Sequence, residues 1–116
     1  MHRFKDLEIW KMSRKFCSEI YELTAKFPDT EKFGITNQLR RASVSVPSNI
    51  AEGASRKSNK DFSRFLEIAI GSIYELETQL LISQDLGFAS KEEINRLLMK
   101  LNSIIKMTSK FKSTLN

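Results

Sequence analysis

Residues 58–87 are SNKDFSRFLEIAIGSIYELETQLLISQDLG, and this stretch decides the fold. Ser58 with Asp61 three positions later is typical of a helix N-terminus, and Gly87 is typical of a left-handed C-terminal cap. Between them, apolar residues recur every three or four positions, which predicts a helix over 59–86 of about 42 Å. Its main apolar face comprises Phe62, Phe65, Leu66, Ala69, Ile70, Ile73, Leu76, Leu80 and Leu81, and a sparser second patch comprises Ile68, Ile82 and Leu86. Two apolar faces on one helix imply two packing partners.

The same periodicity predicts three further amphipathic helices, over residues 6–27, 35–56 and 90–113. The first ends where Phe27 precedes Pro28, because the residue before a proline is steered out of helical geometry. The last begins at Ser90, which forms a capping box with Glu93. We expect that helix to fray near Lys112, which would otherwise project into the apolar face.

The helix over 35–56 contains Pro47, which removes one backbone hydrogen bond and usually kinks a helix. We expect a bend, with Ser43 or Ser48 helping to satisfy the freed groups; two short helices are the alternative. Gly53 near its end can adopt the left-handed cap. Connections are short, and no strand-like alternation is present. The sequence therefore predicts an all-α fold, an antiparallel up-down-up-down four-helix bundle that forms one domain over 1–116.

The residue counts exclude most kinds of catalytic site. With one cysteine, Cys17, and one histidine, His2, an intramolecular disulfide, a Cys/His zinc site and a Ser-His-Asp or Cys-His arrangement are all excluded. Glu75 and Glu77 lie two apart on a helix and point in different directions, so they are not a catalytic pair. Cys17 on an apolar face is expected to be an inert core residue rather than a reactive thiol. We predict a non-enzymatic protein without catalytic residues, metal, cofactor or small-molecule substrate.

No apolar run approaches the roughly 20 residues that cross a bilayer. The segment MHRFKDLEIW at the start has charges where a signal peptide needs its apolar region. The apolar face of the helix over 90–113 is needed for the bundle core, so it cannot also face lipid. We expect a cytoplasmic protein without a membrane partner.

The formal net charge is +5, which permits a polyanionic partner but does not require one. Two basic clusters are candidates for nucleic-acid binding: Lys11, Arg14 and Lys15 on the first helix, and Arg96, Lys100, Lys106 and Lys110 on the last. Glu19 and Glu22 interrupt the first cluster, and for each cluster a solubilising helix face is the alternative. Helix-turn-helix spacing, an RNP-type aromatic motif and a zinc knuckle are absent from the sequence, so binding would depend on charge and shape.

A polar seam runs along the helix over 35–56, away from its main apolar stripe: Gln38, Arg41, Ser45, Asn49 and Glu52. We interpret it as a hydrogen-bonding seam between subunits. Arg41 and Glu52 would pair with neighbouring chains, because three turns separate them within one helix. A solvated face and a ligand site are the alternatives. Ile68, from the second apolar patch, joins this candidate interface. Gly71 costs about 1 kcal/mol in a helix interior relative to alanine, so we expect it to permit close approach of another backbone.

Several motifs occur in a fixed order: FKDLEIW at 4–10, FP at 27–28 with Glu31 three on, QLRRA at 38–42, SVPSNIAEG at 45–53, FLEIAIGS at 65–72 and ELE at 75–77. Through them the chain resembles the bacterial family of four-helix-bundle proteins encoded within intervening sequences of 23S ribosomal RNA genes. The helix over 90–113 carries little of this pattern. The resemblance implies a homopentamer, a ring or barrel with a central channel, and supplies no catalytic residues. A related family, the accessory proteins of diversity-generating retroelements, is similar in fold, forms basic pentamers and works with RNA and a reverse transcriptase.

These observations together predict a non-enzymatic, pentameric RNA- or nucleic-acid-binding protein. Five copies of a modest basic face would act together through multivalency. The alternative is an oligomeric protein-interaction adaptor, in which the basic surface serves solubility or an acidic protein partner. The periodicity supports an oligomer, whereas the number five comes from the resemblance alone.

Overall fold

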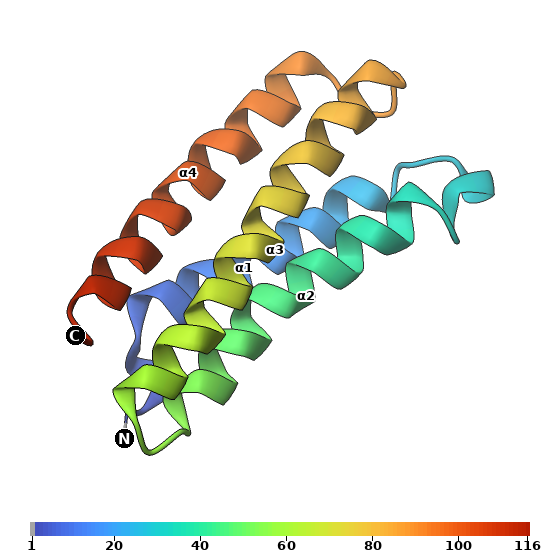
Figure 1. Cartoon of the computed structure of the whole chain (residues 1–116). Coiled ribbons are helices and arrows are strands. Elements are labelled where there is room, and N and C mark those ends of the chain that lie inside the picture. The colour runs from blue at the N-terminus through green and yellow to red at the C-terminus, as the bar shows by residue number, and fades with distance from the viewer. Residues whose placement is uncertain (1) are drawn as a thin grey trace.

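The computed structural model describes residues 2–116, which form a bundle of four α-helices (Figure 1). The helices are α1 (Glu8–Thr24), α2 (Ile35–Ala54), α3 (Asn59–Asp85) and α4 (Lys91–Ser113). Two short 3₁₀ turns, η1 (Phe4–Asp6) and η2 (Asp29–Glu31), lie before α1 and before α2. No strand occurs within residues 2–116, and the molecule is elongated, 43 × 24 × 20 Å. The all-α, four-helix prediction is confirmed.

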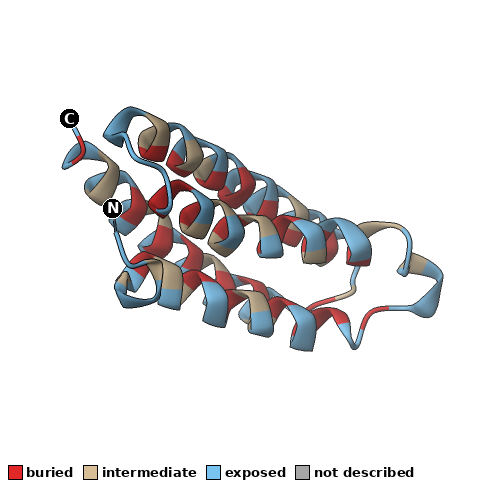
Figure 2. Cartoon of the chain, turned by 90° about the horizontal axis from the view of Figure 1, so that it is seen from below, coloured by how far each residue is buried: buried red, intermediate tan, exposed pale blue. Residues whose placement is uncertain are grey.

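The helices pack in the order of the chain. The α2–α3 contact is the most extensive, followed by α1–α2 and α3–α4, whereas α1 and α4 meet more loosely. Buried residues face the common interior and exposed residues face outward (Figure 2). Fully buried aliphatic side chains come from every helix: Ile20, Leu39, Ile50, Leu66, Leu76, Leu80, Ile94 and Leu97. Burying each side chain of this size contributes about 1.5–3 kcal/mol, so this interior is the main source of stability.

The two predicted capping boxes differ in the structure. At α4, Ser90 Oγ accepts a hydrogen bond from the Glu93 backbone N–H (3.1 Å), and Glu93 Oε1 accepts one from the Ser90 N–H (3.3 Å). At α3, Ser58 Oγ accepts from the Asp61 N–H (3.1 Å), but the Asp61 carboxylate turns to Arg64 instead, at 3.8 Å. Aspartate is one methylene shorter than the glutamate of a complete box, which explains why only half of it forms.

Gly87 ends α3 as predicted. Its φ of +78° is the one positive φ within residues 2–116. The Phe88 N–H donates to the Ser83 carbonyl at 3.0 Å, and the Gly87 N–H donates to the Gln84 carbonyl at 3.0 Å. This pair of hydrogen bonds is a Schellman motif, which satisfies carbonyl groups that the end of a helix leaves free.

Gly53 does not have the predicted role. No left-handed residue occurs there, because α2 continues through Gly53 to Ala54. A Cβ atom at Gly53 would lie 2.7 Å from Phe65 Cβ and 2.8 Å from Phe62 Cδ1, so glycine is required for the close approach of α2 and α3. Around Gly71, where we expected such an approach, a Cβ atom would meet nothing within 4 Å. Within the chain, that expectation is wrong.

Pro47 does not divide α2, which is helical from Ile35 to Ala54, so the alternative of two short helices is wrong. The two serines near it do not have the expected role either. Ser43 Oγ donates to the Arg40 carbonyl (2.8 Å) and lies 3.4 Å from Cys17 Sγ on α1. Ser48 forms no side-chain hydrogen bond within the described chain.

The helix ends also differ from the predicted ones. The helix predicted over 6–27 is shorter, Glu8–Thr24, although Phe27 is buried in the turn beyond it. Conversely, α4 continues through Lys112 to Ser113, so the predicted fraying is wrong. Lys112 Nζ lies 3.1 Å from Glu67 Oε1 on α3, because a long lysine chain can cover apolar surface while its ammonium group reaches a carboxylate.

The two glycines of the α2–α3 pair give the first prediction. Gly53→Ala places a methyl group against Phe62 and Phe65, so we expect the free energy of unfolding to fall by about 1–3 kcal/mol. Gly71→Ala, in open space, is the matched control and is expected to raise it by about 0.5–1 kcal/mol. Urea unfolding followed by circular dichroism measures both. A Gly53→Ala variant as stable as the wild type would show that the helices are not in close contact there.

Candidate nucleic-acid interface

The predicted phosphate-binding side chains are all exposed and lie on two neighbouring helices: Lys11, Arg14 and Lys15 on α1, and Arg96, Lys100, Lys106 and Lys110 on α4. The structure brings part of them together. Lys15 and Lys100 line one groove between the helices, about 270 Å³ in volume, with Phe16 and Ile104 in its wall. We call this surface the α1–α4 basic side, defined by these seven cations.

Glu19 neutralises part of the α1–α4 basic side. Its side chain is only 14% exposed, and it accepts hydrogen bonds from Lys100 Nζ at 2.8 and 2.9 Å and from Arg96 Nη1 at 3.4 Å. Charge-assisted hydrogen bonds of this kind hold the two helices together. From the sequence, Glu19 only interrupts a basic cluster on α1; in the structure it is the acid that two α4 cations share.

The remaining cations of this side are less constrained. Lys11 Nζ lies 3.5 Å from Glu8 Oε1 in an exposed pair, a kind that contributes little to stability. The Arg14 guanidinium lies 5.4 Å from the centroid of the Trp10 ring, within cation–π range. In the part of the chain that the structure describes, ion pairs form at Lys11, Arg96 and Lys100 but not at the other members: Arg14, Lys15, Lys106 and Lys110.

A second groove at the open end of the α1–α4 side is mainly apolar. Leu7, Ile9 and Phe111 form its walls, Lys110 and Glu8 stand beside it, and its volume is about 350 Å³. It exists because α1 and α4 meet loosely. The unpaired Lys110 therefore stands at the edge of apolar surface, with one carboxylate nearby.

The polar seam of α2 is partly used within the chain. Ser45 Oγ lies 2.8 Å from Ser72 Oγ on α3. Asn49 Nδ2 donates to the Ser45 carbonyl (2.8 Å) and to Ser45 Oγ (3.0 Å). Glu52 Oε1 lies 3.5 Å from Arg56 Nη2, in the turn after α2, whereas we expected Glu52 to pair with a neighbouring chain. Ser45, Asn49 and Glu52 therefore already have partners.

The other predicted interface residues are accessible to solvent. Gln38 and Arg41 are exposed and line a groove between α2 and α3 of about 360 Å³. Glu75 and Gln79 of α3 line the same groove, and Gln79 Oε1 is buried without a hydrogen-bond partner. Ile68 is 49% exposed. A buried acceptor without a partner costs about 1–3 kcal/mol, so this groove is the least satisfied polar region between α2 and α3.

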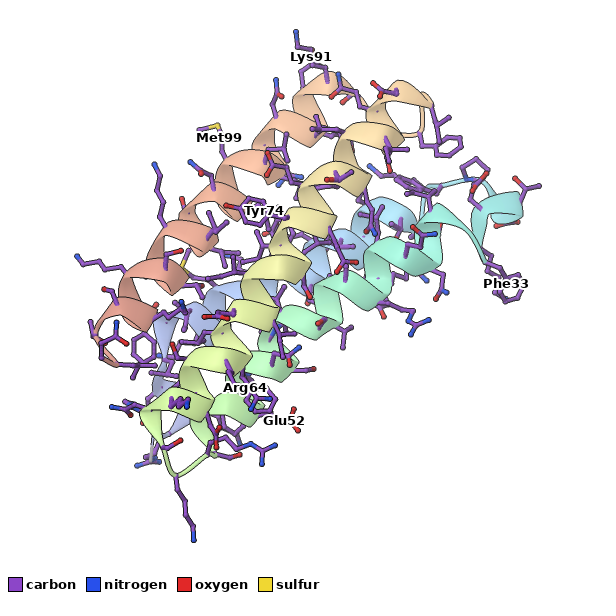
Figure 3. The ribbon with its side chains drawn as sticks, in the orientation of Figure 1. Phe33, Glu52, Arg64, Tyr74, Lys91 and Met99 are labelled. Atoms are coloured by element: carbon purple, nitrogen blue, oxygen red, sulfur yellow. The ribbon has the colours of Figure 1, made fainter. Side chains whose placement is uncertain are left out.

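A further set of functional candidates lies near the start of α2 and was not predicted from the sequence. Phe33 extends from the turn before α2 away from the bundle (Figure 3) and is 88% exposed. Lys32 Nζ lies 5.7 Å from its ring centroid. Arg40, one position before the predicted Arg41, stacks on Tyr21 of α1, with its Cζ 4.7 Å from the ring centroid. The adjacent Lys32–Phe33 and the tandem arginines are the signal that could have indicated this set.

One carboxyl group has a shifted pKa, and it lies where α1 ends and α4 begins. Lys26 Nζ donates to Glu93 Oε2 at 2.8 Å. This hydrogen bond lowers the pKa of Glu93 below its ordinary value, and the backbone N–H of Ser90 lowers it further. Glu93 therefore both caps α4 and joins it to α1.

No group of three or more His, Cys, Asp or Glu side chains that could hold a metal ion occurs among residues 2–116. No described helix combines the length and the hydropathy that a membrane crossing requires.

Comparison with known proteins gives a family match and a similar solved structure. Residues 5–110 match the family model described as "23S rRNA-intervening sequence protein". The chain is also similar to a 1.70 Å crystal structure from Bacteroides thetaiotaomicron VPI-5482, described as a protein of unknown function from the S23 ribosomal protein family. The TM-score is 0.83 at 22% sequence identity, over 90% of this chain and 97% of that chain, so the likeness concerns the fold. No curated protein matches the chain significantly.

The pair of Lys26 and Glu93 gives the second prediction. Because the folded state lowers the pKa of Glu93, its contribution to stability is complete above the ordinary glutamate pKa and is lost as the pH falls through the lowered value. Glu93→Gln is expected to destabilise the protein by up to about 1 kcal/mol near neutral pH and to converge on the wild type as the pH falls through the lowered pKa of Glu93. Urea unfolding across this pH range measures the difference. Glu92→Gln, in the same helical turn, is the control; an equal pH dependence of both variants would contradict the prediction.

Proposed function

Because the chain belongs to the 23S rRNA-intervening sequence protein family, we propose that it is a non-enzymatic RNA-binding protein that works as a homo-oligomer. The name of the family connects it with 23S rRNA. The observation that carries the proposal is the set of cations on the α1–α4 basic side that no carboxylate of the described chain neutralises: Arg14, Lys15, Lys106 and Lys110. Such cations bind phosphates by releasing condensed counterions, without reading the bases.

The distribution of ion pairs supports this choice of surface. Arg96 and Lys100 form charge-assisted hydrogen bonds with Glu19, so their contribution to phosphate binding is reduced. Lys106 and Lys110 lie further along α4, beyond the reach of that acid, and both are exposed. We therefore assign the principal phosphate contacts to the C-terminal half of α4, with Lys15 on α1 beside them.

Oligomerisation would raise the affinity of this modest surface through multivalency. The exposed second patch of α3 supports it: Ile68, Ile82 and Leu86 are 49%, 42% and 55% exposed, respectively. The α2–α3 groove beside this patch offers Arg41 and the unsatisfied Gln79 as polar contacts. A pentamer is the number that the family resemblance implies, and the relation to the retroelement accessory proteins stays part of the same proposal.

The proposed topology is the antiparallel up-down-up-down order. Contacts between α1 and α4 support it, since Lys26 pairs with Glu93, Glu19 with Lys100, and Glu8 shares a groove with Lys110. Along this series the α1 numbers fall as the α4 numbers rise. We place the protein in the cytoplasm, where bacterial ribosomal RNA is made.

The third prediction concerns Lys106 and Lys110. Reversing both charges, Lys106→Glu with Lys110→Glu, is expected to weaken binding to structured RNA by about tenfold or more at low salt and to flatten its salt dependence. Fluorescence anisotropy across a salt series measures the affinity, and sedimentation in the same buffers measures the assembly, which should be unchanged.

The matched control is Lys57→Glu with Lys60→Glu, which changes the net charge equally at two exposed lysines outside the α1–α4 basic side. Equal losses of affinity in the two double variants would show that only net charge matters. If the wild-type oligomer does not bind RNA even at low salt, the RNA-binding proposal is wrong and the adaptor alternative takes its place.

The fourth prediction tests the assembly. Ile68→Asp puts a charge in the proposed apolar contact, so we expect the oligomer to dissociate at concentrations at which the wild type is assembled. The loss of one buried isoleucine corresponds to about 1.5–3 kcal/mol, or roughly tenfold to a hundredfold in the association constant. Sedimentation velocity measures it. Met99→Asp, at a methionine of α4 that is 73% exposed, is the control; a monomeric wild type, or an Ile68→Asp variant that assembles normally, would contradict the prediction.

A further inference from the structure

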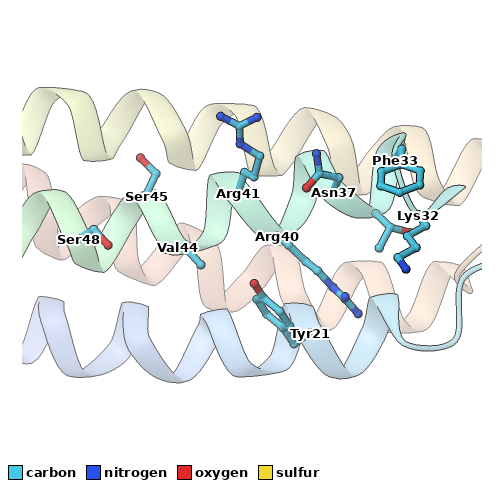
Figure 4. Close-up of a pocket in the computed structure, with 10 residues that line it drawn as sticks. Tyr21, Lys32, Phe33, Asn37, Arg40, Arg41, Val44, Ser45 and Ser48 are labelled. Atoms are coloured by element: carbon cyan, nitrogen blue, oxygen red, sulfur yellow. The ribbon is translucent and has the colours of Figure 1, made fainter.

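The largest of the grooves described in this structure lies along α2 on the side of α1, about 600 Å³ in volume (Figure 4). We call it the aromatic–basic groove and define it by the residues that carry its chemistry: Tyr21, Lys32, Phe33, Thr36 and Arg40. No acidic side chain lines it. By contrast, Glu19 and Glu8 line the two α1–α4 grooves, and Glu75 lines the α2–α3 groove.

Phe33 supplies a flat apolar surface at one end of the groove. At 88% exposure it is the most exposed large apolar side chain within residues 2–116. The core does not use it, since it points away from the bundle (Figure 3). Lys32 Nζ, 5.7 Å from the ring centroid, places a positive charge beside it. An exposed aromatic ring with an adjacent cation is the usual device for stacking an unpaired base near its phosphate.

Arg40 is held in position without being neutralised. Its Nε donates to Thr24 Oγ1 at 2.9 Å, and its guanidinium stacks on Tyr21 at 4.7 Å. Thr24 Oγ1 in turn donates to the Ile20 carbonyl at 2.8 Å, which fixes the hydroxyl. Neither partner is a carboxylate, so the full charge remains. The side chain reaches toward Tyr21, on the other side of α2 from Arg41 (Figure 4). A preorganised guanidinium loses little conformational entropy when it binds a phosphate.

A buried hydroxyl adds a polar contact within the groove. Thr36 is 6% exposed, and its Oγ1 has no hydrogen-bond partner in the described chain. It lines the aromatic–basic groove, so a ligand there could satisfy it. Phosphate, ribose and base edges all provide hydrogen-bond acceptors.

We propose that the aromatic–basic groove binds a single unstacked nucleotide of single-stranded RNA. The base stacks on Phe33, and the adjoining phosphate is bound by Arg40, with Lys32 beside it. This inference rests on the proposed RNA-binding function and deepens it. The α1–α4 basic side would bind RNA through charge alone, and the aromatic–basic groove adds a preference for single strands. A duplex cannot use the site, since its bases are already stacked and paired.

The experiment compares two fluorescein-labelled probes at low salt, an oligouridylate of about twelve nucleotides and an RNA duplex of equal length. Stacking is worth about 1–3 kcal/mol per base, so Phe33→Ala is expected to weaken oligouridylate binding by roughly 5- to 100-fold and duplex binding by no more than about twofold. Phe33→Trp, which keeps an aromatic face, should retain the affinity. Arg40→Gln should weaken oligouridylate binding more than Lys91→Gln, at an exposed lysine of α4.

Met99→Ala removes a comparably exposed apolar side chain from another face and is the control for Phe33→Ala. If the wild type binds oligouridylate and Phe33→Ala behaves like Met99→Ala, the groove proposal is wrong and RNA binding through the basic side stands. Equal losses for the single strand and the duplex would also overturn it, because stacking cannot account for them. If the wild type binds neither probe, both proposals are wrong. Since Phe33 lies outside the core, the Phe33 variants are expected to unfold at the wild-type temperature.

Discussion

The close approach of α2 to α3 positions the rest of the bundle. Gly53 lies against Phe62 and Phe65, where a methyl group would overlap the Phe62 ring and the Phe65 Cβ atom. Further along the same contact, Ser45 and Ser72 share a hydrogen bond of 2.8 Å. Because protein interiors are densely packed, these two contacts together fix the position of α2 relative to α3. α1 then packs on α2 and α4 on α3, which leaves α1 and α4 as the loosest pair.

That looseness determines where charge accumulates. Between α1 and α4 the apolar contact is less extensive, and ion pairs add to it. Lys26 pairs with Glu93, and Lys100 and Arg96 pair with Glu19. These bonds use Glu19 and Glu93, two of the acids that face the gap between α1 and α4. Arg14, Lys15, Lys106 and Lys110 form no ion pair in the described part of the chain, so the same geometry that joins the helices leaves exposed the surface that we propose for phosphate binding.

Much of the fold follows from the sequence, and the failures have physical causes. The four helices, the cap at Ser90 and the left-handed Gly87 depend on local periodicity and backbone conformation, which are visible in the chain. The role of Gly53 depends on what lies opposite it, and that is set by the fold. The bond between Lys100 and Glu19 also depends on the fold. The spacing of charges predicted that Lys100 is exposed on a basic cluster, but not that it pairs with a residue far away in the sequence. Arg40 was missed because helical spacing alone does not separate a cation that faces an aromatic neighbour from one that faces solvent.

The proposed surfaces are compatible because α2 has two sides. Arg40 and Arg41 are adjacent in sequence, so their side chains leave the helix about 100° apart, one toward α1 and the other toward α3. An assembly that covers the α3 side of α2, together with Ile68, leaves Arg40 and Phe33 accessible. It also leaves the α1–α4 basic side open, since α4 does not take part in that contact. Each subunit of such an oligomer would then present a charge-dependent surface and a base-stacking groove, so that repeated copies bind a folded RNA through its backbone and through its unpaired bases.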